Sequence, residues 1–209
     1  MEHFFALTFG AEEQAHQRRK GSLDRYEHAL SAAPVPTGLG AAEAGFLQLR
    51  DSFYIASTGG NGWPYVQHRG GPPGFVKVAG PTQLAWAEST GNRQFITAGH
   101  LDHDDRVAII AVDYPNRKRL KVLGHARFDP DPAPEVLERL GTTGRLEGIM
   151  TVEVVAFDWN CPKYITPRFT VAEMRAATAP LRERIDRLEA ELAAQRAATG
   201  PCPQHERSS

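Results

Sequence analysis

The sequence has little of what would assign a protein to a specialised class. Its 209 residues include only two cysteines, and Cys202 stands in a polar C-terminal stretch, so we expect no structural disulfide. No apolar run approaches the roughly 20 residues that a membrane-spanning helix needs. The formal net charge is −1, so neither a membrane nor a nucleic acid is an expected partner. The first ten residues, MEHFFALTFG, lack a basic leader and a long apolar stretch, so we expect no secretory signal and a cytoplasmic location.

Several catalytic and metal-binding motifs are also missing from the sequence. It contains no Walker loop and no GxGxxG motif. His100 and His103 stand beside acidic residues in GHLDHDD, but no second pair of ligands matches them, so no zinc site is expected. No histidine can be paired with Cys161 as its base, so we assign this cysteine no catalytic role. What remains, with 41% hydrophobic and 23% charged residues, is typical of a soluble globular domain with appendages.

Composition divides the chain into four regions. Residues 1–40 combine a charged arm with a linker that contains Pro and Gly, and residues 41–169 contain most of the strand-like segments. Residues 170–197 are helical in pattern, and residues 198–209 are expected to form a disordered tail.

The second region predicts six or seven strands. The segments with strand composition are DSFYIAST, WPYVQHR, GFVKV, QLAWAES, RVAIIAVDY, RLKVLGHARF and GIMTVEVVAFDW. GGNG predicts a hairpin turn after the first of them. Short helices are expected in AAEAGFLQLR, GNRQFITAGHL and DPAPEVLERLG, the last ending at Gly141. Because long helical crossovers are few, the pattern predicts a mainly β fold with flanking helices, of the α+β class, whose antiparallel sheet closes into a barrel.

The third region predicts an amphipathic C-terminal helical extension. TVAE, from Thr170 to Glu173, is a capping box that starts a helix, and Pro180 can start a second one. After it, apolar residues recur at steps of four, three and four: Leu181, Ile185, Leu188 and Leu192. A helix this short is marginal alone in water, so the apolar stripe must pack on something. Its own barrel and a partner helix across a dimer both remain open.

The stretch YVQHRGGPPG has more polar and flexible residues than a core strand needs. Strand alternation places Gln67 and Arg69 on one face, and Val66 and His68 on the other, where Val66 can fill a core. Gly70 and the following glycines allow a flat ligand to lie against the backbone. This arrangement suits a planar heterocycle with polar edges. The alternative is a solvated strand end with a Gly-Pro turn.

The stretch AESTGNRQF is a candidate phosphate cradle. Ser89, Thr90, Asn92 and Arg93 follow a strand and precede an expected helix. Hydroxyl groups, backbone N–H groups at a helix start and a guanidinium all favour a phosphate. An N-cap with no ligand is the alternative. Lys77, in GFVKV, is a lone cation among apolar neighbours.

Two further segments carry polar groups. DWNCPKYITPRF, residues 158–169, leaves the last strand with Asn160 and Lys163, a mixture common in loops that line sites. In NRKRLKV, Arg117, Arg119 and Lys121 alternate, so they share one face. That face is either solvated or in contact with a phosphate or a nicotinamide dinucleotide.

Taken together, these segments resemble the pyridoxamine 5′-phosphate oxidase-like family of FMN-binding split barrels. The resemblance covers roughly residues 40–169 and is carried by three stretches: GGNGWPYVQHRGGPPGFVKV, LAWAESTGNRQFITAGHLDHDDRVAIIAVDYPNRKRLKV and DWNCPKYITPRF. It implies a six-stranded antiparallel split barrel that forms a homodimer, with FMN in a groove at the interface.

The resemblance also implies roles for individual residues. Gln67, His68 and Arg69 would lie along the isoalloxazine ring and ribityl chain, and Arg69 would stabilise the anionic reduced flavin. Segment 160–164 would approach the flavin, from the other subunit in one arrangement. Residues implied near the phosphate are Lys77, Ser89, Asn92 and Arg93.

The function implied by the resemblance is an FMN-dependent oxidoreductase that acts by hydride transfer on an unidentified small molecule, with a nicotinamide donor as one candidate partner. One departure matters. The oxidase itself carries residues for its substrate's phosphate in a C-terminal segment, and here that region is rich in Leu and Ala. Oxidation of the vitamin is therefore not expected. The alternatives are haem or a deazaflavin on the same barrel, or a non-catalytic flavin-binding or scaffold protein that recruits a partner through its C-terminal helix.

Overall fold

The computed structural model describes residues 1–32, 34–141, 145–159 and 162–198. Its contacts divide the chain into two units, Met1–Thr166 and Pro167–Ser209. The expected tail, residues 198–209, lies outside the described residues except for its first residue. None of the helices in the described ranges is long and apolar enough to cross a membrane.

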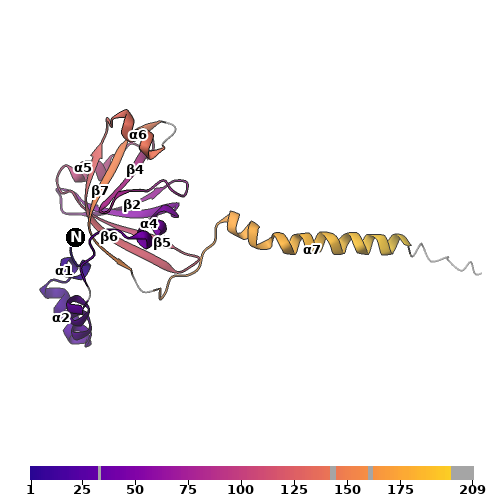
Figure 1. The fold of residues 1–209 in the computed structure, drawn as a ribbon, viewed down its shortest axis with the longest axis horizontal. Helices are drawn as coiled ribbons and strands as arrows, with labels where there is room; N and C mark the ends of the chain where they lie inside the picture. Colours follow the sequence, from indigo (N-terminus) through magenta and orange to yellow (C-terminus); the bar gives the residue numbers. More distant parts are fainter. Residues whose placement is uncertain (33, 142–144, 160–161, 199–209) are drawn as a thin grey trace, which may run out of the picture. The chain divides into compact units, whose positions relative to one another are not determined.

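Among its described residues, the first unit is built on a single antiparallel sheet of seven strands (Figure 1). The strand order is β2-β1-β5-β6-β7-β4-β3. GGNG forms the expected turn between β1 and β2, where Gly62 has a φ of 79° that favours glycine. The strands are β1 (Ser52–Thr58), β2 (Pro64–Gly70), β3 (Lys77–Gly80), β4 (Gln83–Ser89), β5 (Arg106–Asp113), β6 (Lys118–Asp129) and β7 (Leu146–Trp159).

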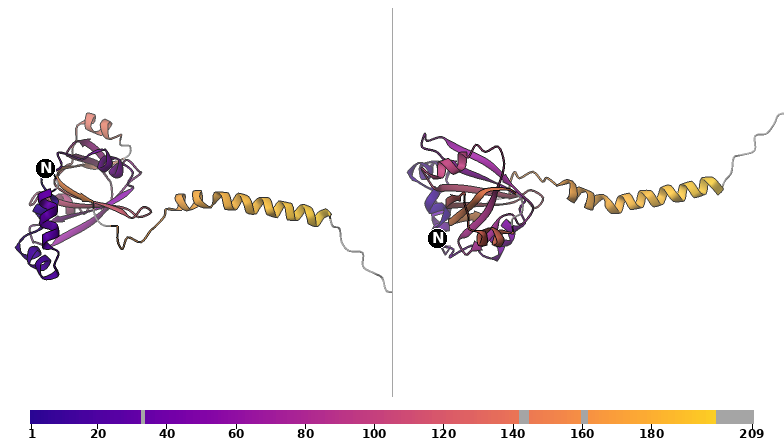
Figure 2. Two further views of the ribbon diagram at one scale, coloured as in Figure 1. Left: turned by 60° about the horizontal axis from the view of Figure 1, so that its bottom comes forward. Right: turned by 90° about the horizontal axis from the view of Figure 1, so that it is seen from above.

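This sheet corrects the expected six-stranded closed barrel. There are seven strands among the described residues, and the sheet does not close, because its edge strands β2 and β3 each pair on one side only. The short β3 lengthens one end of the sheet through its pairing with β4. The two ends nevertheless approach each other, because the sheet bends around one core (Figure 2).

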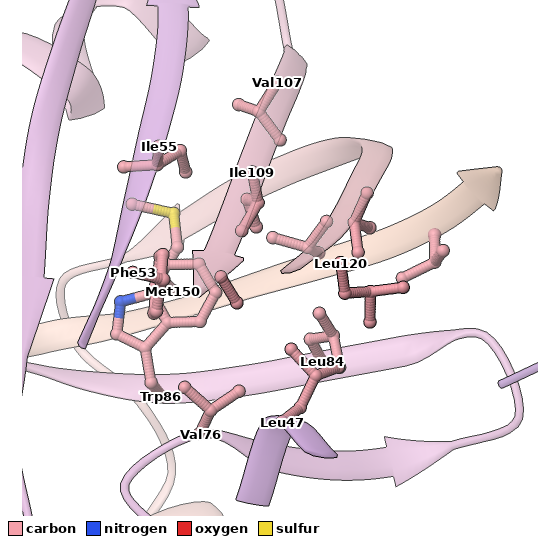
Figure 3. Close-up of a cluster of buried hydrophobic side chains, with 14 of the residues drawn as sticks. Leu47, Phe53, Ile55, Val76, Leu84, Trp86, Val107, Ile109, Leu120 and Met150 are labelled. Atoms are coloured by element: carbon pink, nitrogen blue, oxygen red, sulfur yellow. The ribbon is translucent and has the colours of Figure 1, made fainter. Parts of the chain in front are cut away.

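The core lies inside this bend and draws on both ends of the sheet. Phe53 of β1 and Trp86 of β4 pack edge to face, with ring centroids 5.0 Å apart, although their strands are not neighbours. Burying each large apolar side chain stabilises the fold by about 1.5–3 kcal/mol. Figure 3 shows the labelled core side chains converging: Leu47, Phe53, Ile55, Val76, Leu84, Trp86, Val107, Ile109, Leu120 and Met150.

Helices flank the sheet and include the three expected within residues 41–141. Gly141, with a φ of 61°, ends α6 as expected. Near the N-terminus, the rings of Phe5, Phe9 and Tyr26 pack together, and the backbone N–H of Glu2 donates to the carbonyl of Val155 on β7. The helices of the first unit are α1 (Phe4–Thr8), α2 (Ala11–Lys20), α3 (Leu23–Ala32), α4 (Ala41–Gln48), α5 (Ile96–Leu101) and α6 (Pro134–Leu140).

A partly buried ion pair ties α4 to the sheet. Arg50, which follows α4, places Nη2 3.2 Å from Oδ2 of Asp113 at the end of β5. Asn116 donates its backbone N–H and its side-chain amide to the same carboxylate. Burial raises the pKa of Asp113, but the hydrogen bonds from Asn116 and the charge of Arg50 outweigh it, so the pKa lies below its usual value.

Over its described residues, 167–198, the second unit contains one helix, α7 (Val171–Ala198). The predicted capping box is present: the backbone N–H of Thr170 donates to Glu173, and that of Glu173 donates to Thr170 Oγ1 at 3.1 Å. The prediction that Pro180 starts a second helix is wrong, because Pro180 lies inside α7. A proline within a helix removes one backbone hydrogen bond, and here the helix continues past it.

Candidate functional site

A cavity of about 320 Å³ lies where the two ends of the sheet approach each other. Its walls come from the end of β2, the end of β4, the loop after β4 and the start of α5. Phe75, Trp86 and Phe128 supply apolar surface. The structure thus brings together most of the site residues predicted from sequence: Gln67, His68, Arg69, Gly70, Ser89, Asn92 and Arg93.

Strand β2 presents Gln67 and Arg69 to this cavity. The prediction that Val66 fills a core is wrong, because Val66 lies on the outward face of the strand. Along β2 the residues are alternately exposed and half-buried, and Val66 is 61% exposed instead of filling a core. The inward face is polar because its side chains pair with other polar residues that line the cavity. Gln67 Oε1 accepts a hydrogen bond of 2.9 Å from Thr97 Oγ1, and Thr97 is only 2% exposed.

Arg69 is held by an acidic partner. Its Nε lies 2.7 Å from Oε1 of Glu88 on β4, and both side chains are largely buried. Trp86 Nε1 donates to the same oxygen at 2.7 Å, which fixes the carboxylate from a second direction. The guanidinium therefore enters the cavity as half of an ion pair, and not as the uncompensated cation that the sequence suggested.

The loop after β4 has an unusual backbone at the cavity wall. Asn92 Oδ1 accepts from the backbone N–H of Gln94, and both Arg93 and Phe95 have left-handed φ values, 57° and 50°. Left-handed conformations at residues other than glycine cost on the order of 1–3 kcal/mol and concentrate at binding sites. This strain supports the view that the loop has a role beyond connecting β4 to α5.

Arg93 forms a second acidic pair that differs from the first in exposure. Its Nε lies 3.3 Å from Glu147 Oε1, and the Arg93 side chain is 62% exposed. The Glu147 side chain is only 16% exposed, so within this pair it is the Arg93 guanidinium that reaches solvent. Arg93 is therefore the cation at this cavity that can most easily bind an incoming phosphate.

Other predicted residues stand apart from the cavity or add less to it. His68 lines the cavity, but its ring packs edge-on against Tyr54. Lys77 belongs to β3 opposite Ala85 and is not among the lining residues. Lys163 is exposed and also lies outside the lining. Asn160 lies outside the described residues.

The chain's own last loop borders a different hollow. Pro162 and Trp159 line a second groove, of about 920 Å³, together with Phe46 and Arg117. The described part of segment 160–164 therefore contributes nothing to the cavity between β2 and β4 in the same chain.

Among the lining residues that sequence reasoning missed, three form a side-chain hydrogen bond or ion pair with a predicted residue: Glu88, Thr97 and Glu147. A signal existed for Glu88, because it stands two residues after Trp86 and so extends a buried strand face with a charge. A charge on a buried face requires a partner, and Arg69 is that partner. Thr97 and Glu147 had no comparable signal.

The chemistry open to this cavity is limited by its side chains. Within residues 1–32, 34–141, 145–159 and 162–198, no group of three His, Cys, Asp or Glu could hold a metal ion. The cavity offers three amides, two hydroxyl groups, two guanidinium groups that are each paired with a carboxylate, and aromatic surface. These groups can bind and orient a planar molecule that has polar edges and an anionic end.

No family model and no curated protein matches this sequence. Solved structures do match. A candidate pyridoxamine 5′-phosphate oxidase from Lactobacillus delbrueckii is 19% identical, with 58% of this chain and 93% of that chain covered and a TM-score of 0.46.

Two further matches differ in the ligands that their descriptions name. An FMN-binding protein from Syntrophomonas wolfei is 11% identical, with coverage of 70% and 97% and a TM-score of 0.43. HutZ, a haem storage protein from Vibrio cholerae, is 15% identical, with coverage of 56% and 91% and a TM-score of 0.38. The descriptions of several matched structures name the oxidase family that the sequence resembles.

Proposed function

We propose that this protein is an FMN-binding member of the pyridoxamine 5′-phosphate oxidase-like class and that the cavity between β2 and β4 is its flavin site. One observation carries the proposal. The cavity unites the Gln67–Arg69 strand end with the Ser89–Arg93 loop, two segments that the sequence independently marked for a planar ring and for a phosphate.

The residues present fit FMN in kind. The Gln67 amide is oriented by Thr97 and can serve a ring edge that has both donors and acceptors. Arg93 and the Ser89 hydroxyl can bind a phosphate. Phe75, Trp86 and Phe128 provide apolar surface for a ring system. A single cradle of this kind favours one phosphate, hence FMN over FAD.

The size of the cavity favours a site shared between two copies. About 320 Å³ is at the lower end of the roughly 300–1,000 Å³ that ligand pockets occupy. A two-fold homodimer would complete two equal sites through one interface. In that arrangement the partner copy would supply the segment 160–164, whose described residues border another groove in their own chain.

Bound FMN would supply hydride transfer, and the protein would bind, orient and shield it. Arg69 and Glu88 would hold a fixed polar edge with no net charge, and Trp86 would keep Glu88 in place. None of these residues is placed as a general base, which is consistent with a reaction that needs positioning more than proton abstraction. A small molecule would be the substrate.

The visible absorption spectrum of the purified protein tests this proposal. We expect a flavin spectrum that bleaches when a nicotinamide donor is added without oxygen and returns in air. A haem or deazaflavin spectrum would contradict the proposed cofactor. A flavin that no nicotinamide donor reduces would favour the second candidate, a non-catalytic flavin-binding protein.

A further inference from the structure

The apolar residues of α7 follow a heptad over most of the helix. The stripe predicted from sequence extends toward the N-terminus to Met174 at alternating steps of four and three, with the polar residues Thr178 and Gln195 at two of the seam positions. These are the a and d spacings of a coiled coil, which sustain one seam along a helix. The seam positions are Met174, Thr178, Leu181, Ile185, Leu188, Leu192 and Gln195.

Contacts within the second unit leave this seam largely uncovered. Leu181, Ile185, Leu188 and Leu192 are each 45–65% exposed. Pro180 falls at heptad position c, away from the seam, so its ring does not interrupt the apolar row. A row of exposed leucines is costly in water unless another helix covers it.

The identities of the seam residues favour two strands over three or four. Ile185 occupies an a position, between Leu181 and Leu188 at d positions, and Thr178 and Leu192 occupy the neighbouring a positions. Within parallel coiled coils, a β-branched residue at a with leucine at d favours two strands. In that arrangement each seam residue meets the same residue of a second copy.

The charges beside the seam agree with a parallel pair. Position g of one helix faces position e of the next heptad in its partner. Arg184 at g would face Glu189 at e of a second copy, and Glu191 at g would face Arg196. Both pairs are attractive, and two-fold symmetry doubles each of them.

An antiparallel pair fits the charges less well. It would place position g beside g and position e beside e. Arg184 would then face Glu191 and Arg182 would face Glu189, and both of these pairs are attractive. The same register would also bring Arg175 opposite Arg196, which is repulsive.

We propose that α7 is a dimerisation helix that forms a parallel two-stranded coiled coil with α7 of a second copy of this chain. The pairing requires no flavin, so it stands or falls separately from the proposed function. With few heptads, the coiled coil contributes specificity of pairing and a modest share of stability. Parallel pairing also places the two Thr170 helix starts at the same end, which is compatible with a dimer of the first units.

Disulfide cross-linking of the full-length protein tests this arrangement. Both native cysteines are first replaced, by Cys161→Ser and Cys202→Ser. Leu181→Cys then places a thiol in the seam, and Glu183→Cys, at outward position f, is the matched control. Thiols that face each other have a high effective concentration, so Leu181→Cys should cross-link at least ~10-fold faster than Glu183→Cys. Equal rates would overturn the proposal, because they would mean that α7 either remains a single helix or packs on its own chain.

A charge exchange distinguishes the two orientations. In the Leu181→Cys background, Arg184→Glu should slow cross-linking, because it would face Glu189 of the second copy. Adding Glu189→Arg should restore the rate. Restoration by Glu191→Arg instead, or cross-linking of a mixture of Leu181→Cys and Leu192→Cys chains faster than either alone, would show an antiparallel pair and overturn the proposal.

Discussion

Arg69 of β2 and Glu88 of β4 form an ion pair, with Nε and Oε1 2.7 Å apart, that joins one edge strand to the strand beside the other edge in a sheet whose backbone does not close. The pair stands at the wall of the proposed flavin site. It therefore has two consequences, one for the fold and one for the ligand. Removing either partner leaves the other in a largely buried position without its counter-charge.

Replacing Arg69 tests whether the cavity is the flavin site. Arg69→Ala removes a charged donor and leaves Glu88 as a lone negative charge at the cavity wall, so FMN binding should weaken by on the order of 1.5–3 kcal/mol. Flavin fluorescence titration measures the change, and circular dichroism checks the fold. Val66→Ala, on the exposed face of the same strand, is the control and should bind like the parent. A folded Arg69→Ala variant with parental affinity would place the flavin elsewhere.

Replacing Glu88 separates the charge of the pair from its geometry. Glu88→Gln keeps an oxygen that can accept from Trp86 Nε1, but it removes the negative charge beside Arg69. FMN binding should become tighter, or at least not weaker, because the guanidinium then contributes a net positive charge near an anionic ligand. A loss as large as that of Arg69→Ala would mean that the ion pair acts only by holding the cavity in shape.

Arg93 provides a test of where the phosphate lies. Because the Arg93 side chain is 62% exposed, Arg93→Ala should leave the fold intact, although Glu147, at 16% exposure, loses this counter-charge; circular dichroism checks the fold. The variant's affinity for FMN should fall by about 1.5–3 kcal/mol, since a charge-assisted contact is lost. Riboflavin, which has no phosphate, is the matched ligand control, and its affinity should change little. An equal loss for both ligands would indicate that Arg93 contacts the ring or only shapes the loop.

The pair between Arg50 and Asp113 predicts how stability depends on pH. The pKa of Asp113 is lowered in the folded protein, so its ionised form stabilises the fold above the unfolded-state pKa of about 3.9. That contribution is lost as the pH falls through the folded-state pKa. Asp113→Asn should cost about 1–3 kcal/mol of unfolding free energy at neutral pH. The difference from the parent, measured by urea unfolding, should shrink below about pH 4. A constant difference down to acid pH would contradict the assignment.

Truncation tests which unit holds the proposed homodimer together. A chain that ends at Phe169 lacks α7, and we expect it to remain a dimer that binds FMN, though less stably, because the first unit should supply most of the interface. Light scattering and flavin titration are the measurements. A monomer with full FMN affinity would refute a site at the interface. A monomer that loses FMN would mean that α7 carries the dimer.

Much of the sheet could be predicted from sequence because its strands have clear patterns. The alternation in RVAIIAVDY and the turn GGNG correspond to β5 and to the turn after β1. The described residues form seven strands, whereas the family resemblance implies six, and the short strand β3 accounts for the difference. Closure could not be predicted, because it depends on how far the sheet bends.

The site was predictable in composition but not in electrostatics. The sequence marked Gln67 and Arg69 as a polar pair on one strand face, and the structure places both at the cavity. Val66 was assigned to the core because it is apolar, yet the inward face of β2 is polar, since it meets Thr97 and Glu88 from distant segments. Pairings of that kind depend on tertiary structure, and local patterns do not contain them.

The most direct test of the proposed function is the identity and amount of the bound cofactor. The full-length protein is purified without added flavin, denatured by heat and centrifuged, and the released small molecules are separated by chromatography and quantified against the protein. We expect FMN, at a ratio that approaches one per chain when the protein is saturated with FMN before purification. FAD, a deazaflavin or haem in place of FMN, or no bound cofactor even after saturation, would contradict it.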